Sequence, residues 1–285
     1  MKKIQRALVL LVLGALAALP WAPARAGTAG PDVLYLHGVL NSTGCPGIKT
    51  ATQAAPLATV LKAAGYTGTV KGVDFECGDS TGVDIKPYGT LAKAKYNVNA
   101  RIEDVAYALA QYIKATYTDQ GRTVSLVGHS MGGLIAGYAV KKYGAQVASI
   151  VSISTPYGGF DEIPAGFTPT SYVTMPTVCG QYVQCKEMVM GSPFLTELAS
   201  FPLPGTTITT IGGSPKDIFS FASTAATASQ HNVNYYATSP VNYGHTAYIT
   251  DTSMKLDVPL QLDGVARTAQ PHSLLMVARA LLGLT

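Results

Sequence analysis

Few residues of this chain are charged, and beyond its first segment the chain carries no net charge. Of 285 residues, 13% are Asp, Glu, Lys or Arg, and the formal net charge is +4. Residues 1–26 contain no acid and four bases, which are Lys2, Lys3, Arg6 and Arg25. Subtracting these four charges leaves a formal charge of zero. Because nucleic-acid binding needs a basic surface that neutralises phosphates, we do not expect nucleic acid as a partner.

The chain also lacks long apolar runs, except for one at its N-terminus. Residues 7–19 are apolar and follow a basic start, Pro20 ends the run, and residues 24–26 read Ala-Arg-Ala. This run is shorter than the roughly 20 residues that a transmembrane helix needs, and it precedes a small-residue cleavage site. We therefore predict a signal peptide over residues 1–26, a secreted (extracellular or periplasmic) protein and no stable membrane anchor. Residues 27–285 contain no internal repeat and are predicted to form a single domain.

Cysteine is scarce as well. The four cysteines, Cys45, Cys77, Cys179 and Cys185, all follow the predicted signal peptide. In an oxidising compartment an even number favours disulfides, and four cysteines allow three pairings. We favour Cys45–Cys77, which would join loops at the ends of neighbouring strands, and Cys179–Cys185, which would close a short loop. Zinc binding is the alternative, but the spacing does not fit a zinc motif, and no cofactor or metal is implied.

Apolar segments of two kinds alternate along the chain. Continuous apolar or β-branched runs predict buried strands over 32–36, 69–75, 123–127, 147–153, 206–211 and 256–262, the last strand. Helices are predicted over 54–64, 97–118, 134–142 and 273–282. This alternation predicts an α/β fold with a mostly parallel central sheet and helices on both faces. We expect a loop over 264–271.

Residues 160–204 interrupt the alternation. They are rich in Pro and Gly and include apolar residues such as Phe160, Phe167 and Met175. Because long segments without regular structure in a compact domain are usually functional, we predict a cap or lid insertion over the site. A plain surface excursion is the alternative.

One segment places a serine between a strand and a helix. Residues 128–132, Gly-His-Ser-Met-Gly, fit G-x-S-x-G and lie between the predicted strand 123–127 and the predicted helix 134–142. The glycines permit a sharp turn that exposes Ser130 Oγ, and the N–H groups of the helix point to where negative charge would develop. We therefore predict Ser130 as a nucleophile.

A serine nucleophile needs a base and an acid that orients the base. The candidate bases are His245 and His272; we predict His272, because it lies between the last strand and the last helix and can reach the carboxyl edge of the sheet. The acid is expected after a strand, between the serine and the histidine in chain order. Asp217 follows the strand 206–211 by a Gly-rich turn and is our prediction, with Asp251 as its main rival. For the oxyanion hole we predict the backbone N–H groups of Met131 and Val39.

These residues resemble the motifs of secreted bacterial lipases and esterases of the α/β-hydrolase superfamily. The resemblance covers nearly the whole chain after the signal peptide and depends on L-H-G-V at 36–39, G-H-S-M-G-G at 128–133, S-T-P-Y-G-G at 154–159, C-K-E-M at 185–188, G-S-P-F-L at 191–195 and P-H-S-L-L at 271–275. It implies an α/β-hydrolase fold, Ser130 as nucleophile, His272 as base, and Val39 and Met131 as oxyanion donors, and it supports Asp217. The segment 212–252 departs from the family pattern, which keeps Asp251 and His245 open.

Together these features predict a secreted serine ester hydrolase that forms an acyl-enzyme on Ser130. We expect a lipase that acts as a monomer on triacylglycerol or other long-chain carboxylic esters, with the lipid–water interface as a site of action. Short-chain esters, thioesters and polyesters are alternative substrates for the same residues. A non-catalytic binding protein on a hydrolase scaffold is the alternative from another class, because a fold does not fix a function.

Overall fold

The computed structural model describes residues 30–39, 50–76, 81–89, 100–160, 182–202, 204–214, 216–217, 229–235 and 243–285. The predicted signal peptide, Cys45, Cys77 and Cys179 lie outside the described residues, as do residues 161–181 of the predicted cap. The signal peptide and both disulfide pairings therefore stay predictions.

Within the described residues, nine strands form one sheet in the order β3-β2-β1-β4-β5-β6-β7-β8-β9. The strands are β1 Asp32–Leu36, β2 Val70–Asp74, β3 Val83–Asp84, β4 Val124–His129, β5 Ser149–Ile153, β6 Thr207–Gly212, β7 His231–Asn234, β8 Val258–Leu262 and β9 Val265–Gln270. All neighbouring pairs from β3 to β7 are parallel, whereas β8 is antiparallel to both β7 and β9. The carboxyl ends of β1, β4, β5 and β6 consequently meet at one edge of the sheet.

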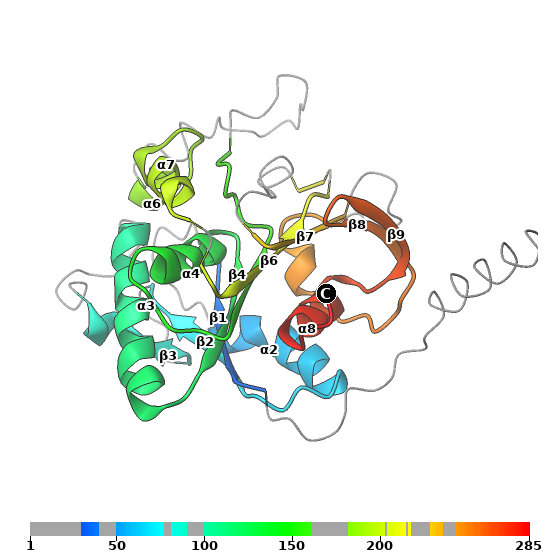
Figure 1. The fold of residues 1–285 in the computed structure, drawn as a ribbon, viewed down its shortest axis with the longest axis horizontal. Coiled ribbons are helices and arrows are strands. Elements are labelled where there is room, and N and C mark those ends of the chain that lie inside the picture. Colours follow the sequence, from blue (N-terminus) through cyan, green and yellow to red (C-terminus); the bar gives the residue numbers. More distant parts are fainter. Residues whose placement is uncertain are drawn as a thin grey trace, which may run out of the picture.

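Helices cover both faces of this sheet, with α3 and α4 on one side and α2 and α8 on the other (Figure 1). The α-helices are α2 Thr50–Ala63, α3 Ile102–Thr116, α4 Met131–Lys141, α6 Val183–Glu187, α7 Pro193–Ser200 and α8 Ser273–Leu281. Short 3-10 helices are η1 Lys86–Tyr88, η3 Thr118–Gln120 and η5 Ala247–Ile249. None of the helices in the described part of the chain combines the length and the apolar character needed to cross a membrane.

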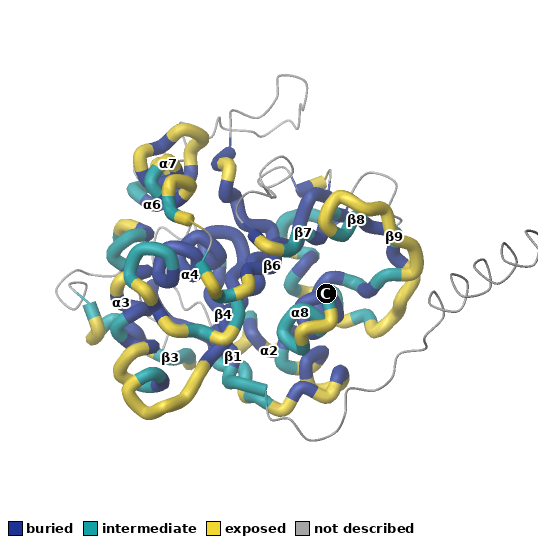
Figure 2. Tube along the Cα trace, viewed as in Figure 1, coloured by how far each residue is buried: buried dark blue, intermediate teal, exposed yellow. Residues whose placement is uncertain are grey.

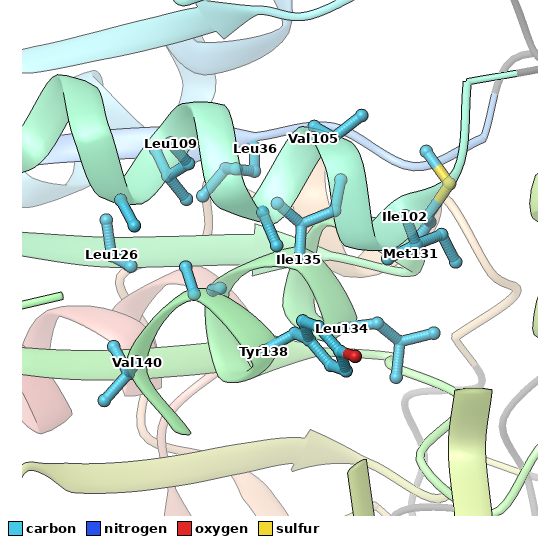
Figure 3. Close-up of a cluster of buried hydrophobic side chains, with 14 of the residues drawn as sticks. Leu36, Ile102, Val105, Leu109, Leu126, Met131, Leu134, Ile135, Tyr138 and Val140 are labelled. Atoms are coloured by element: carbon cyan, nitrogen blue, oxygen red, sulfur yellow. The ribbon is translucent and has the colours of Figure 1, made fainter. Parts of the chain in front are cut away.

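The core is divided by the sheet into two apolar clusters. Successive side chains of a strand point to opposite faces, so Leu126 of β4 packs in the cluster with α3 and α4, and Val127 packs in the cluster with α2 and α8. Figure 3 shows part of the first cluster, in which Ile135 of α4 lies on the side of that helix that faces α3, the helix that carries Val105 and Leu109. All six residues of β4 are buried, and Figure 2 shows the same burial along the central strands.

The predicted α/β fold with a mostly parallel sheet and helices on both faces is confirmed. Two expectations at the C-terminal end are wrong: residues 265–270 form β9 where a loop was expected, and β8 is therefore not the last strand. Strand β7 was not predicted, and the part of the cap segment that the structure describes contains the helices α6 and α7. Five residues of β9 are exposed, so this strand has no apolar alternation that could reveal it.

Candidate active site

Ser130 lies in a strained turn between β4 and α4. Its φ and ψ angles are 54° and −124°, a conformation that L-residues rarely adopt, and it is the N-cap residue of α4. The backbone N–H of Ser130 donates to the carbonyl of Ile153 at 2.9 Å. A Cβ atom on Gly128 would lie 2.4 Å from the carbonyl carbon of Gly132, and one on Gly132 would lie 2.2 Å from Leu36 O. The turn therefore requires glycine at both of these positions.

The loop after β1 lies directly against Ser130. A Cβ atom on Gly38 would lie 2.9 Å from Ser130 Cβ and 3.3 Å from Ser130 Oγ. The ring of His37 stacks on Phe75, with 4.1 Å between centroids, and its Nδ1 lies 2.7 Å from Gly38 O, to which it donates. The Gly38 carbonyl and the Val39 N–H belong to one planar trans peptide and point in opposite directions. By holding the carbonyl, His37 fixes the direction of the expected oxyanion donor.

The second expected donor, the N–H of Met131, begins α4. The first N–H groups of a helix have no partner within the helix and carry its positive dipole end. Met131 is fully buried directly after Ser130. The N–H of Met131 and the loop at Gly38 thus flank the same serine, as an oxyanion hole requires.

Asp217 faces His245 in the interior of this edge of the sheet. Asp217 is fully buried, and its Oδ1 lies 2.9 Å from His245 Nδ1. Since a carboxylate only accepts hydrogen bonds, the proton of the neutral imidazole resides on Nδ1. The lone pair of the neutral ring is then on Nε2, as a general base for a serine requires.

The segment that carries His245 is bound to the residue before the serine. His129 Nε2 lies 2.8 Å from the backbone carbonyl of His245, and the two rings are 4.9 Å apart between centroids. Complete burial, with the ring of His245 as a further cause, lowers the pKa of His129 to about 3. His129 is therefore neutral at physiological pH and donates its Nε2 proton to the carbonyl of His245. This bond joins the candidate base to the turn that holds Ser130.

His272 does not reach Asp217, and this corrects the expected pairing. Its Nδ1 lies 2.7 Å from Asp251 Oδ2 and its Nε2 lies 2.7 Å from Asp257 Oδ1. The physical reason is that both ring nitrogens of His272 contact these two carboxylates, whereas the segment after β7 brings His245 to Asp217. The structure brings Asp217 to His245, the histidine that the sequence left as the alternative.

The rival acid, Asp251, belongs to this second cluster. Its Oδ2 accepts from the hydroxyl of Tyr243 at 2.6 Å as well as contacting His272. Tyr243 also accepts from the backbone N–H of Ser273, the first residue of α8. The cluster around His272 therefore joins the segment after β7 to the N-terminus of α8.

Ser154 is a member of the site that the sequence did not predict. It follows β5 directly, is fully buried and has a φ angle of 51°. Its hydroxyl donates to Asp217 Oδ2 and lies 2.9 Å from His245 Nδ1. The only sequence signal for it is its position at the start of the S-T-P-Y-G-G segment, immediately after a buried strand.

The described part of the cap segment packs on the sheet side that carries α3 and α4. The backbone of Phe160 pairs with that of Met188 and Met190, and Glu187 Oε2 accepts from the N–H of Ile102 at 2.7 Å. Val189 is 39% exposed and Met190 is 52% exposed, so the turn between α6 and α7 presents apolar side chains to solvent.

The described residues contain no group of three or more His, Cys, Asp or Glu that could hold a metal ion.

Comparisons with known proteins agree with this architecture. The family model described as alpha/beta hydrolase fold matches residues 77–185. No curated protein matches the chain.

Solved structures provide likenesses at low sequence identity. The mature form of the Bacillus licheniformis lipase BlEst2 is 17% identical to this chain, with a TM-score of 0.40. The match covers 70% of this chain and 71% of that chain. Aspergillus fumigatus lipase B is 13% identical, with a TM-score of 0.49 and coverages of 81% and 52%. An extracellular α/β-hydrolase from a Paenibacillus species is 14% identical, with a TM-score of 0.44 and coverages of 79% and 96%. None of these likenesses bears on the activity of the present chain. The family match, the sheet order and the turn at Ser130 identify the chain as a protein with the α/β-hydrolase fold.

Proposed function

We propose that this protein is a secreted serine ester hydrolase, with Ser130 as nucleophile, His245 as general base and Asp217 as the acid that orients His245. The N–H groups of Val39 and Met131 form the oxyanion hole. No cofactor takes part. The predicted signal peptide, export and the disulfides Cys45–Cys77 and Cys179–Cys185 belong to the same proposal.

The proposed reaction proceeds through an acyl-enzyme. Ser130 Oγ attacks the ester carbonyl while His245 Nε2 takes the hydroxyl proton, and Asp217 accepts the Nδ1–H bond of the imidazolium that forms. The carbonyl oxygen becomes negative and is stabilised by the N–H groups of Val39 and Met131. Nε2 then gives its proton to the leaving alcohol. Water, activated by the same nitrogen, releases the acid.

One observation carries the proposal: the buried Asp217 contacts His245 at 2.9 Å, and His245 is joined through His129 to the strained turn of Ser130. His272 has carboxylates at both ring nitrogens, so its Nε2 already contacts Asp257. Perturbed or buried titratable pairs at the carboxyl edge of an α/β sheet are typical of catalytic sites.

A long-chain carboxylic ester is the substrate class that we propose. The exposed Val189 and Met190, on the segment paired with Phe160, supply apolar surface that an acyl chain can contact. The proposal includes a lipase that works as a monomer at a lipid–water interface. Short-chain ester hydrolysis uses the same catalytic residues and differs only in this apolar surface.

The test is the initial rate on p-nitrophenyl esters of increasing chain length. Wild type is compared with Ser130→Ala, His245→Ala and His272→Ala, each checked for its fold by circular dichroism. We expect Ser130→Ala and His245→Ala to lose at least about a thousandfold in kcat and His272→Ala to retain activity. Stoichiometric labelling of wild type but not of Ser130→Ala by a fluorophosphonate would support the nucleophile. If Ser130→Ala hydrolyses esters at the wild-type rate, the proposed nucleophile is wrong. If the wild type neither hydrolyses esters nor is labelled, the proposal is refuted in favour of a binding protein.

A further inference from the structure

Ser154 has no place in the mechanism described above, although it lies beside both partners of Ser130. It is fully buried directly after β5, and its backbone N–H donates to Ile211 O at 2.7 Å. Its φ angle of 51° lies in the left-handed region, as does the 54° of Ser130. A glycine would adopt this conformation without the steric cost of a Cβ atom. The chain nevertheless has a serine there, so the side chain itself needs an explanation.

The contacts of the Ser154 hydroxyl explain why this position carries a serine. Oγ lies against Asp217 Oδ2 and is 2.9 Å from His245 Nδ1. A hydroxyl has one proton, and a carboxylate can only accept, so Ser154 donates to Asp217. Its oxygen then faces the Nδ1–H group of His245 as an acceptor. Ser154 thus completes a triangle in which Asp217 Oδ1 and Ser154 Oγ share one imidazole proton.

We propose that Ser154 is a positioning residue for the hydrolysis, holding the carboxylate of Asp217 and the ring of His245 in the orientation that keeps the proton on Nδ1. This inference depends on the proposed function of Ser130, His245 and Asp217. With both carboxylate oxygens engaged, Asp217 cannot rotate about its last side-chain bond without losing a hydrogen bond. The Ser154 proton also stabilises the negative charge of Asp217 and so moderates its attraction for an imidazolium.

Removing the hydroxyl should alter the protonation of the base as well as the rate. In Ser154→Ala the charge of Asp217 is less stabilised by hydrogen bonding and interacts more strongly with the protonated ring of the base. The acidic limb of the kcat/KM profile, which reports protonation of the base in the free enzyme, should therefore move to higher pH. A residue that only shaped the turn would leave this limb in place.

The experiment measures kcat and KM on a soluble p-nitrophenyl ester across the pH range. Its variants are Ser154→Ala and Ser154→Gly, and its control is Ser152→Ala. Ser152 is also fully buried, two residues earlier on β5, but its hydroxyl bonds the hydroxyl of Tyr157 at 2.7 Å. We expect Ser154→Ala to lose about tenfold in kcat, with KM changed less than about twofold and the acidic limb raised by about half a pH unit. Ser152→Ala should keep the wild-type limb.

The glycine variant separates positioning from backbone strain. Ser154→Gly lacks the hydroxyl but fits the φ angle, so it should be as slow as Ser154→Ala even though it folds more easily. If Ser154→Gly recovers wild-type kcat, or if neither variant shifts the acidic limb, Ser154 is only a turn residue. If Ser154→Ala does not fold, Ser154→Gly alone gives the same decision. Fluorophosphonate labelling of wild type at Ser130 shows separately whether the proposed function stands.

Discussion

The carboxylate of Asp217 contacts the ring of His245, with 2.9 Å between Oδ1 and Nδ1. We predict that Asp217→Asn lowers kcat by about 10⁴-fold, because the amide can donate to Nδ1 and so favour the ring tautomer that carries its proton on Nε2. Steady-state kinetics on a p-nitrophenyl ester measure this loss. Asp251→Asn is the matched control, since it removes the carboxylate beside His272, and its kcat should change less than about threefold. The opposite ranking would make Asp251 and His272 the catalytic pair.

His272 should act on stability and hardly on catalysis. Its side chain is 13% exposed and contacts both Asp251 and Asp257, so His272→Ala leaves the half-buried Asp251 without one partner. We expect the free energy of unfolding to fall by about 1–3 kcal/mol, measured by urea denaturation. His231→Ala removes a histidine from a more exposed pair with Asp263, at 3.2 Å, and should cost less than about 1 kcal/mol. Equal losses for the two variants would contradict a structural role for the His272 cluster.

The central strands could be read from the sequence because they are buried on both faces. Every residue of β4 is buried, and a continuous apolar run before G-x-S-x-G is what such a strand needs. Strand β9 lacks this signal because it is exposed at the edge of the sheet. The short β7 has one buried residue, Val233, among four, and was missed for the same reason.

The choice of base could not be made from chain order. Asp217–His245 and Asp251–His272 both follow Ser130 in the order acid, then histidine, and both lie after strands. What separates them is tertiary contact: the backbone carbonyl of His245 binds His129, the residue before Ser130, whereas both ring nitrogens of His272 contact Asp251 and Asp257. Such contacts between distant segments leave no local sequence pattern. Ser130 and the loop of Gly38 were predictable, in contrast, because their turns demand glycine next to a buried strand.

The space between Gly38 and Ser130 gives a test of the oxyanion loop. A Cβ atom at residue 38 would lie 2.9 Å from Ser130 Cβ, so Gly38→Ala must displace either the loop or the serine. We predict a loss of about a hundredfold in kcat, comparable to removal of one oxyanion donor. Gly205→Ala is the control, because an added Cβ there meets no atom within 4 Å and the φ angle is not in the left-handed region. Wild-type kcat for Gly38→Ala would show that the N–H of Val39 does not stabilise the oxyanion.

Glu76 should make stability decrease as pH rises. It is 4% exposed, and burial, with the nearby charge of Asp74, raises its pKa from 4.5 to about 8. The folded state therefore holds a proton that the unfolded state has lost between these values, so stability is greatest below about pH 4.5 and declines toward pH 8. Glu76→Gln removes this decline and should be more stable than wild type at pH 8 by about 1–3 kcal/mol in urea denaturation. Glu103→Gln should show the opposite sign, because Lys142 lowers the pKa of Glu103 and the variant loses that stabilisation above about pH 4.5. If the free energy of unfolding changes by the same amount from pH 5 to pH 8 in the wild type and in Glu76→Gln, the raised pKa of Glu76 is contradicted.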